Sequence, residues 1–565
     1  MLTGATEGAR EAASAARVEM EQPTSSASSV VFSTFEQALK IVGPMGSYQL
    51  SFAASFQAFI ILLAGNYTLL SYSTYQPTVR CLDANGTLLA TVDRDVKRNN
   101  TFCELLRDGH CTSLRYEAPF RTIIEEWQLL CELDYLPSLT SSVQMAGSVV
   151  AIFTSGYLSD RFGRRRVFNI AFYALIAVML VGALSTNPFA FMATRAVLGS
   201  LMSTTFVALF VWGMEMTDQA NSVLLNVCAQ WHLAYMITAG VAYVAGGWRA
   251  YLWTLFALSW PLVGVYCWFI ESPRWMIQEG SKKEAAALLS RLGSYNRKHK
   301  VVITEENLAG ISVQKHDQGS YKMLLTNWRL VKYLLLCAML MYGTGAAASG
   351  FMFELTRQEG SPFWRVFLFG FSRLLIMAPI YLLDKKLAWW GRRHMCLIPM
   401  LVVAGCYLTA AVISAARPMG LGEQSWEVMA AILAGAVTCN FMWVGIGQYH
   451  VELFPTSLRN NAATLAGIAD VLAGVLSPIW VKLEGRVPGL PFMVVAGVHA
   501  LTIPTAYFLL PETKGRRIPD TLADVLSIEA TPVPGSKWSA PVDLGRCCGE
   551  QDALLNDEDE DDLPT

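Results

Sequence analysis

Two ionisable side chains lie inside long apolar runs, where a charge is costly. Arg373 falls within the run 363–383 and Asp470 within the run 461–481. An unpaired charge at the middle of a membrane helix costs a few kcal/mol, so such residues usually serve a function. A carboxylate in a low-dielectric cavity attracts a cation, and a guanidinium binds a carboxylate. Either Arg373 and Asp470 bind an organic ion, or they pair with each other and leave a neutral site.

Aromatic rings could complete such a site through cation–π contacts. We select Trp231, Tyr342 and Trp443, which lie in other apolar runs, as candidate substrate-binding residues. The alternative for each ring is packing in the core or against lipid, which is the commoner role of an aromatic side chain in such a run.

A second group of chemically informative residues forms a short charged turn, Gly156-Tyr-Leu-Ser-Asp160-Arg161-Phe-Gly163-Arg164-Arg-Arg, between two apolar runs. Gly156 would let helices approach closely, and Gly163 would permit the chain to reverse. Asp160 can bond a helix N-terminus or pair with Arg161 or Arg164. We expect this turn to act as a gate that locks one side of a membrane protein. The alternative is a basic loop that only sets topology.

Other charged residues occupy the ends of apolar runs and are further gating candidates: Glu271, Arg274, Glu452, Arg459 and Glu512. We expect them to form ion pairs with the charged turn across two halves of the molecule, which hold an outward-open state and break as the halves move. The alternative is ordinary interfacial charge, worth about 0–1 kcal/mol for each exposed pair. A weak echo of the turn, Asp384 followed by Gly391-Arg392-Arg393, appears in the second half. Seven positions separate Asp384 from Gly391, so we expect this second turn to be degraded.

Membrane-spanning helices must position these residues. Of the 565 residues, 53% are hydrophobic and 16% are charged, whereas soluble domains carry roughly 25% charged residues. The apolar runs are continuous and reach the roughly 20 residues that a helix needs to cross a bilayer. About twelve such runs are present. The net charge of −2 argues against a nucleic-acid partner, and no motif indicates an enzyme, a cofactor or a metal site.

Basic loops indicate which segments face the cytoplasm. The resulting division is a cytoplasmic N-terminal segment 1–47, a six-helix half 48–270 that includes an extracellular loop 72–136, a cytoplasmic linker 271–330, a second six-helix half 331–511 and a cytoplasmic acidic tail 512–565. The tail contains Leu554-Leu555 after acidic residues, which resembles a dileucine sorting signal and suggests a sorting adaptor as a partner.

The loop 72–136 carries features of an extracellular segment. It contains four cysteines, namely Cys81, Cys103, Cys111 and Cys131, and glycosylation sequons at Asn85 and Asn99. An even number of cysteines beside sequons predicts disulfides in an oxidising compartment, with three pairings open. The alternative is four free thiols and unused sequons.

Several motifs, in order, resemble the organic cation/anion/zwitterion transporter family (solute carrier family 22) of the major facilitator superfamily. They are Phe35-Glu-Gln-Ala-Leu-Lys-Ile-Val-Gly43, Glu126-Trp127-Gln-Leu-Leu-Cys131, Glu271-Ser-Pro273-Arg274-Trp275, Glu452-Leu-Phe-Pro455-Thr-Ser-Leu-Arg459 and Pro511-Glu512-Thr-Lys-Gly515. The resemblance implies an all-α membrane protein with the major facilitator fold, in which two six-helix halves enclose a substrate site.

The family places charges in spans eight and eleven, and this chain departs from that rule. Cation carriers of the family have acids there, and anion and carnitine carriers typically have an arginine in span eleven. The matching positions are Ser372 and Val471, one residue away from Arg373 and Asp470. One residue is a rotation of about 100° on a helix, so the family's charge rule does not transfer directly.

The expected function is a secondary transporter that moves small organic ions, preferably cations or zwitterions, by alternating access. Membrane lipid is the expected surrounding, and the plasma membrane the expected location, with endosomal or lysosomal membranes as alternatives. Two other functions stay open. One is a receptor-like or regulatory protein that keeps the fold without ordinary transport, and the other is an organic anion or sugar-type carrier.

Overall fold

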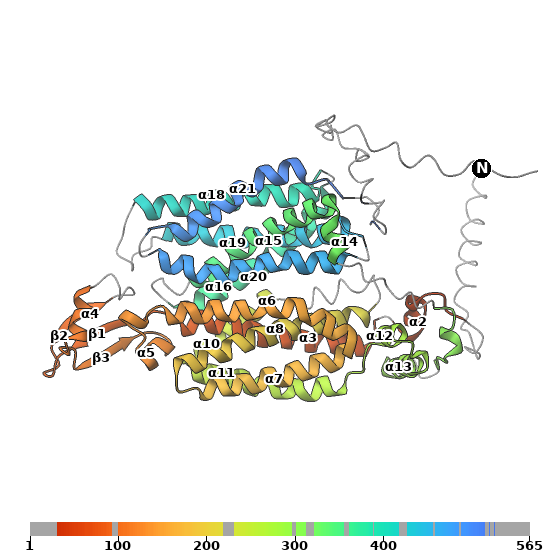
Figure 1. Ribbon diagram of the computed structural model, residues 1–565, viewed down its shortest axis with the longest axis horizontal. Helices are drawn as coiled ribbons and strands as arrows, with labels where there is room; N and C mark the ends of the chain where they lie inside the picture. The colour runs from red at the N-terminus through yellow and green to blue at the C-terminus, as the bar shows by residue number, and fades with distance from the viewer. Residues whose placement is uncertain are drawn as a thin grey trace, which may run out of the picture.

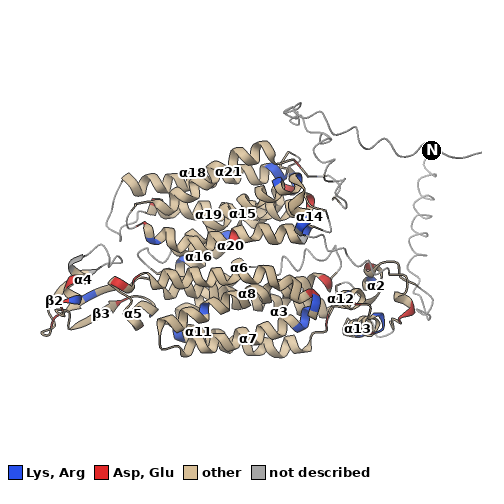
Figure 2. Ribbon diagram, viewed as in Figure 1, with Lys and Arg blue, Asp and Glu red and all other residues tan. Residues whose placement is uncertain are grey.

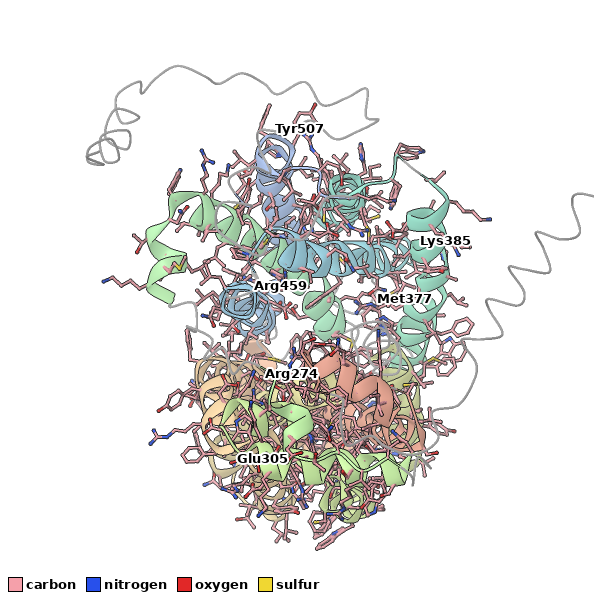
Figure 3. All side chains as sticks on the ribbon, turned by 90° about the vertical axis from the view of Figure 1, so that its right-hand side faces the viewer. Arg274, Glu305, Met377, Lys385, Arg459 and Tyr507 are labelled. Carbon is pink, nitrogen blue, oxygen red and sulfur yellow. A yellow bond between two sulfur atoms is a disulfide. The ribbon has the colours of Figure 1, made fainter. Side chains whose placement is uncertain are left out.

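The structure is a computed structural model. It describes residues 31–43, 45–92, 100–217, 231–296, 301–311, 321–354, 361–387, 389–416, 426–455, 458–484 and 487–514, with residues 519 and 525. Long helices dominate this part of the chain and stack in two halves, one above the other in Figure 1. Figure 3, turned by 90°, shows the same two halves from one end.

Eleven helices in the described part are long and apolar enough to cross a membrane. The first half contains α3 (Ser47–Ser73), α6 (Leu136–Phe162), α7 (Arg164–Leu184), α8 (Pro188–Glu215) and α11 (Trp248–Trp268). The second half contains α15 (Trp328–Glu354), α16 (Pro362–Leu375) running into α17 (Met377–Lys386), α18 (Arg392–Ala416), α19 (Trp426–Glu452), α20 (Arg459–Leu483) and α21 (Leu490–Leu509). Helix α10 (Trp231–Ala245) is apolar but shorter, and residues 218–230 before it lie outside the described residues. The twelfth span stays a prediction.

Helices α6 and α8 pack at very close range in the first half. A Cβ atom on Gly147 would overlap the carbonyl of Ala196, and one on Gly199 would overlap the carbonyl of Gln144. Ser148 adds a hydrogen bond from its hydroxyl to the Gly199 carbonyl at 3.1 Å. Small residues allow this approach, as is common between membrane helices.

Gly156 does not take part in such a contact, although we expected it to bring helices together. A Cβ atom there would meet nothing within 4 Å. The expectation was wrong because Gly156 lies on an exposed face of α6, whereas Gly147 lies on the face that contacts α8.

The segment between α3 and α6 folds as an insert at one end of the bundle (Figure 1). Strands β1 (Thr78–Leu82), β2 (Leu88–Val92) and β3 (Ser113–Glu117) form an antiparallel sheet in the order β2-β1-β3, with helices α4 (Asn100–Arg107) and α5 (Ile123–Trp127) beside it. The apolar runs, from which we predicted an all-α protein, did not indicate this sheet. Disulfides join Cys81 to Cys111 and Cys103 to Cys131, so the structure selects one of the three pairings. We call this end of the bundle the insert end.

The sequon at Asn85 lies in the exposed turn between β1 and β2. The Asp83 carboxylate shapes this turn by accepting from the backbone N–H groups of Asn85 at 2.7 Å and Thr87 at 3.0 Å. Hydrogen bonds from Thr87 hold the pKa of Asp83 below its usual range. Asn99, the other predicted glycosylation site, lies outside the described residues.

The opposite end, which we call the linker end, carries a small helical module (Figure 1). It comprises α2 (Phe35–Val42), α12 (Pro273–Gln278), α13 (Lys282–Tyr295) and the short 3₁₀ helix η4 (Glu306–Leu308). The Asn296 side chain joins the module to the first half, because it accepts from the backbone N–H of Tyr48 at 3.1 Å and donates to the Gly43 carbonyl at 3.0 Å. Helix α14 (Tyr321–Thr326) then leads into α15.

Candidate functional site

At the linker end of the first half, Arg164 is the centre of a charged cluster. The Arg164 side chain is buried and pairs with Glu215 at 2.9 Å and with Asp160 at 2.8 Å. It also donates to the Ser159 carbonyl at 3.1 Å. A buried guanidinium needs such partners, because an unpaired buried charge is strongly destabilising.

The turn between α6 and α7 is held by Glu271, which follows α11. The Glu271 carboxylate accepts from the backbone N–H of Arg165 at 2.9 Å, and the Trp275 indole donates to the Asp160 carbonyl at 2.7 Å. Gly163 reverses the chain with a φ of 95°, as its sequence position predicts. A Cβ atom on Gly163 would lie 2.7 Å from Oε2 of Glu271, so glycine is needed for both conformation and space.

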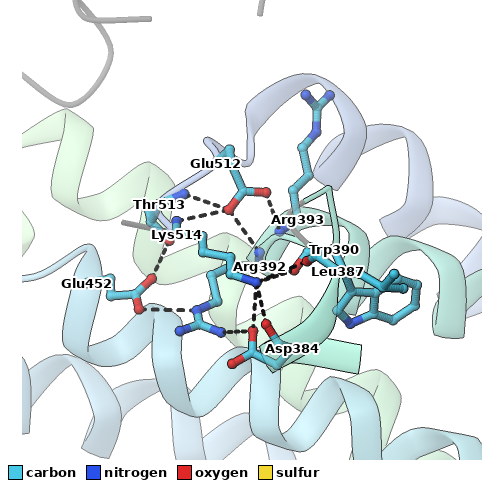
Figure 4. A network of polar contacts seen from close by, with 9 residues as sticks. All are labelled: Asp384, Leu387, Trp390, Arg392, Arg393, Glu452, Glu512, Thr513 and Lys514. Carbon is cyan, nitrogen blue, oxygen red and sulfur yellow. Dashed lines mark hydrogen bonds and ion pairs between the residues drawn. The ribbon is translucent and has the colours of Figure 1, made fainter. Parts of the chain in front are cut away.

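The second half carries a matching cluster around Arg392 (Figure 4). The Arg392 guanidinium pairs with Asp384 at 2.8 Å and with Glu452 at 3.1 Å. Its backbone N–H donates to Glu512 at 2.8 Å. Each half therefore holds one arginine between an aspartate and a glutamate, with a second glutamate accepting from the backbone at the start of the next helix.

The longer turn after Asp384 does not degrade this second cluster, contrary to our expectation. The Lys514 ammonium donates to the carbonyls of Asp384 at 2.7 Å and Trp390 at 3.0 Å, and it pairs with the Asp384 carboxylate at 3.3 Å. Trp390 is buried in a small cluster that includes Ile380 and Phe441. The extra residues are thus anchored by an ammonium from a distant part of the chain and by a buried ring.

These clusters close within their own halves, whereas we predicted ion pairs across the halves. Figure 2 shows the charges gathered at the helix ends, separately in each half. Arg274 pairs with Glu36 of α2 at 3.3 Å, and Arg161 donates to the Tyr157 hydroxyl at 2.7 Å. Arg459 begins α20 and lies near the boundary of the halves in Figure 3. In this arrangement the acids accept from arginines and backbone amides of their own half, and ion pairs between the halves in an outward-open state stay a prediction.

Toward the insert end the halves do contact each other. Lys482 at the end of α20 pairs with Asp134, just before α6, at 3.2 Å. Further along the same two helices, the Ser142 hydroxyl donates to the Val475 carbonyl at 2.8 Å.

Aromatic rings add to this contact around Phe363, at the start of α16. Its ring centroid lies 5.4 Å from that of Tyr72, 6.0 Å from that of Phe120 and 5.7 Å from that of Tyr243. The halves are therefore joined at the insert end by apolar and polar contacts.

Arg373 and Asp470 lie in the interior, on α16 and α20. Arg373 is buried and donates two hydrogen bonds to the side-chain oxygen of Asn440 on α19, at 2.9 and 2.5 Å. Its guanidinium also lies over the Phe369 ring, 5.0 Å from the centroid. Within the described residues Arg373 therefore pairs with an amide, although it lies close enough to Asp470 to interact with it electrostatically.

Asp470 is half-buried on the side of α20 that faces α15. A Cβ atom on Gly345 of α15 would overlap Oδ1 of Asp470 and lie 3.2 Å from the Cβ of Ala473. Tyr67 of α3 and Tyr235 of α10, both in the first half, lie within electrostatic range of Asp470.

A series of aromatic rings runs from the first half to Arg373. Trp231 lies 6.0 Å from Tyr67 and 6.4 Å from Tyr235 between ring centroids, and Tyr235 lies 5.8 Å from Phe369. Trp231 thus joins this series, and its role in substrate binding stays a prediction. The other two candidates, Tyr342 and Trp443, are half-buried and pack against the main hydrophobic core.

Asn440 is the residue of this site that sequence reasoning missed. It lies at the middle of an apolar run, where a polar amide is costly unless it is hydrogen-bonded. That signal was present in the sequence, but it does not identify which helix supplies the partner.

A family model described as "Sugar (and other) transporter" matches residues 45–521. Solute carrier family 22 member 7 from Rattus norvegicus is 28% identical over 414 residues, which cover 72% of this chain and 75% of the relative. Organic cation/carnitine transporter 2 from Homo sapiens is 28% identical over 422 residues, covering 72% of each chain. The organic cation transporter protein of Drosophila melanogaster is 25% identical over 444 residues, covering 75% and 78%.

Solved structures share the fold. The inward open conformation of the xylose transporter XylE from E. coli aligns with a TM-score of 0.58 and 16% identity, covering 85% of this chain and 100% of that one. The same major facilitator superfamily symporter bound to 6-bromo-6-deoxy-D-glucose gives a TM-score of 0.56, with coverage of 84% and 98%. These likenesses confirm the predicted fold class.

Proposed function

The chain belongs to the sugar (and other) transporter family of the major facilitator superfamily, and we propose that it is a secondary carrier that moves small organic cations or zwitterions. Its relatives include proteins named for organic cation and carnitine transport. The substrate site is the region around Asp470, Arg373 and the ring of Trp231, with Tyr342 and Trp443 as further candidates.

The single observation that carries this proposal is the charge arrangement between the halves. Asp470 is a half-buried carboxylate that lies within electrostatic range of side chains of the other half, and Arg373 pairs with a neutral amide. The interior therefore offers a negative group and a positive group that are not bonded to each other. An organic cation would be attracted to Asp470, and a zwitterion would find a partner for each of its charges.

Alternating access follows from the two ends of the bundle. The charged clusters at the linker end close within each half, while Asp134, Lys482 and the rings around Phe363 join the halves at the insert end. We take the insert end to be extracellular and the linker end to be cytoplasmic, so this arrangement corresponds to an inward-facing carrier. Rocking of the halves would then break the contacts at the insert end and bring the halves together at the linker end.

The plasma membrane is the location that fits these features best. Two disulfides and an exposed sequon at Asn85 suit an extracellular insert. Leu554 and Leu555, outside the described residues, would direct the protein to endosomal membranes if a sorting adaptor binds them.

A receptor-like protein without transport is the second candidate. The expected loss of the second charged turn and the displaced charges at Arg373 and Asp470 favour it, and the assembled cluster around Arg392 removes the first of these two supports. An organic anion or sugar-type carrier is the third candidate. The half-buried carboxylate of Asp470 would repel an anion, which argues against anions as the sole substrates.

Uptake into proteoliposomes tests the proposal. A panel of radiolabelled cations, zwitterions, anions and sugars should give saturable uptake of cations or zwitterions, and Asp470→Asn should reduce it. Saturable uptake of sugars or anions alone would support the third candidate. Binding of a ligand without uptake of any compound would support the receptor-like candidate.

A further inference from the structure

Arg373 and Asn440 form a buried pair whose positive charge is not neutralised by its partner. The Nε and Nη2 atoms of Arg373 donate to Oδ1 of Asn440 at 2.9 and 2.5 Å. Arg373 is 6% exposed and Asn440 is 2% exposed. Arginine is usually paired with a carboxylate in such a setting, and that pairing would cancel its charge. The amide holds the guanidinium in place and keeps its charge.

The other end of the Asn440 amide is an unused donor. Only Oδ1 can accept from a guanidinium, so Nδ2 must point away from it. Among the described residues Nδ2 is buried and has no hydrogen-bond partner. A buried donor in that state costs roughly 1–3 kcal/mol, so one normally finds an acceptor. The Nη1 atom of Arg373 also lies outside the pair with Asn440.

We propose that Arg373 and Asn440 form a subsite for the carboxylate group of the substrate. Asn440 orients the guanidinium through Oδ1 and donates a second hydrogen bond to the substrate from Nδ2. This inference rests on the proposed transport function and specifies its substrate class as a zwitterion. The cationic group of that zwitterion lies toward Asp470, and its carboxylate lies at Arg373 and Asn440.

The surroundings fit both ends of such a molecule. The Phe369 ring lies beneath the guanidinium and continues to Tyr235, 5.8 Å away between centroids. Tyr235 lies within electrostatic range of both Arg373 and Asp470. These rings suit an alkylammonium group, while the arginine and the amide supply donors for an oxyanion.

A purely structural role for the pair makes a different prediction. If Arg373 and Asn440 only fasten α16 to α19, changing Asn440 should weaken every substrate equally. The test therefore compares choline with glycine betaine. Both carry a trimethylammonium group, but betaine has a carboxylate where choline has a hydroxymethyl group.

The experiment measures binding and uptake of both probes by the full chain in proteoliposomes. Asn440→Asp replaces the donor with a negative oxygen and neutralises Arg373. We expect the Kd of betaine to rise by about 10- to 100-fold, as loss of a charge-assisted hydrogen bond implies, with the Kd of choline changed less than about twofold. Asn440→Ser retains a neutral side chain and should still raise the betaine Kd by about tenfold. Asn85→Asp, on the exposed turn of the insert, is the matched control.

Each outcome decides between the two ideas. Selective loss of betaine in either Asn440 variant supports the subsite, and equal loss of both probes overturns it. Selective binding of betaine without uptake by the wild type keeps the subsite but contradicts the carrier function. If the wild type binds neither betaine, a longer-chain betaine nor butyrate, the subsite is wrong, even when choline is transported.

Discussion

Arg164 and Arg392 hold equivalent places in the two halves of the molecule. Each is the first residue of a long helix and pairs with an aspartate from the preceding helix, at 2.8 Å in both halves. Each also pairs with a glutamate at the end of a further helix, Glu215 or Glu452. The sequence repeats only weakly, yet the two charged clusters have the same plan.

The two acids of each cluster should differ in importance. The Asp160 side chain is 48% exposed and that of Glu215 is 12% exposed. Breaking a buried ion pair costs about 3–5 kcal/mol, whereas an exposed pair contributes about 0–1 kcal/mol. We expect Glu215→Gln to lower the free energy of unfolding by several times as much as Asp160→Asn. Thermal unfolding in detergent would measure both, and equal losses would contradict this ranking.

The long helices and the fold class could be predicted from the sequence because a bilayer imposes a length and a composition. The residue types of the turn at Gly163 were equally informative, since a reversal beside a carboxylate requires glycine. The partner of each charge was not predictable. Glu271 and Glu512 follow the ends of α11 and α21. Only the packing of the helices decides whether their carboxylates bond to groups of their own half or of the other half.

The second turn shows how spacing alone can mislead. The number of positions in the sequence from Asp384 to Gly391 indicated a degraded motif. Lys514, from a distant part of the chain, nevertheless contacts the carbonyls of that turn. The same limit applies to Asn440, whose partner Arg373 is 67 residues away. Contacts of this kind depend on the rotation of helices about their axes, which hydrophobic periodicity does not fix in a fully apolar run.

Gly163 should be much less tolerant of alanine than Gly156 in the same charged turn. Gly163→Ala places a Cβ atom at a φ of 95° and 2.7 Å from Glu271, which should cost about 1–2 kcal/mol in backbone strain alone. Gly156→Ala is the control, since it has open space and should gain up to about 1 kcal/mol of helix stability. Unfolding temperatures and single-molecule exchange rates measure both variants. If Gly163→Ala changes neither the unfolding temperature nor the exchange rate, the turn does not constrain the charged cluster.

Gly345 should matter for substrate binding because it makes room for Asp470. Gly345→Ala would force the Asp470 carboxylate to move, since the new Cβ overlaps Oδ1. We expect the Kd of a cationic probe to rise about tenfold, equivalent to about 1.4 kcal/mol. Gly350→Ala on the same helix meets nothing within 4 Å and should leave the Kd unchanged. Equal Kd values for both variants would mean that the position of Asp470 does not determine cation affinity.

Asp134 and Lys482 should act as a latch between the halves at the insert end. They pair at 3.2 Å with side chains that are 15% and 27% exposed, so the pair is shielded enough to contribute about 1 kcal/mol to this closed contact. Lys482→Gln should therefore raise the ratio of open to closed insert ends by about fivefold. Spin labels on α6 and α20 would measure it as a longer distance distribution.

An exposed ion pair within the insert provides a control for the Lys482→Gln variant, and a charge swap provides a rescue. Arg107 and Glu132 form an ion pair within the insert at 3.2 Å, with side chains 72% and 82% exposed, and Arg107→Gln should leave the distance distribution unchanged. The charge swap Asp134→Lys with Lys482→Asp should restore closure, because the attraction survives when both signs are reversed. If the swap stays as open as Lys482→Gln alone, the two residues do not act through their charges, and closure rests on the rings around Phe363 instead.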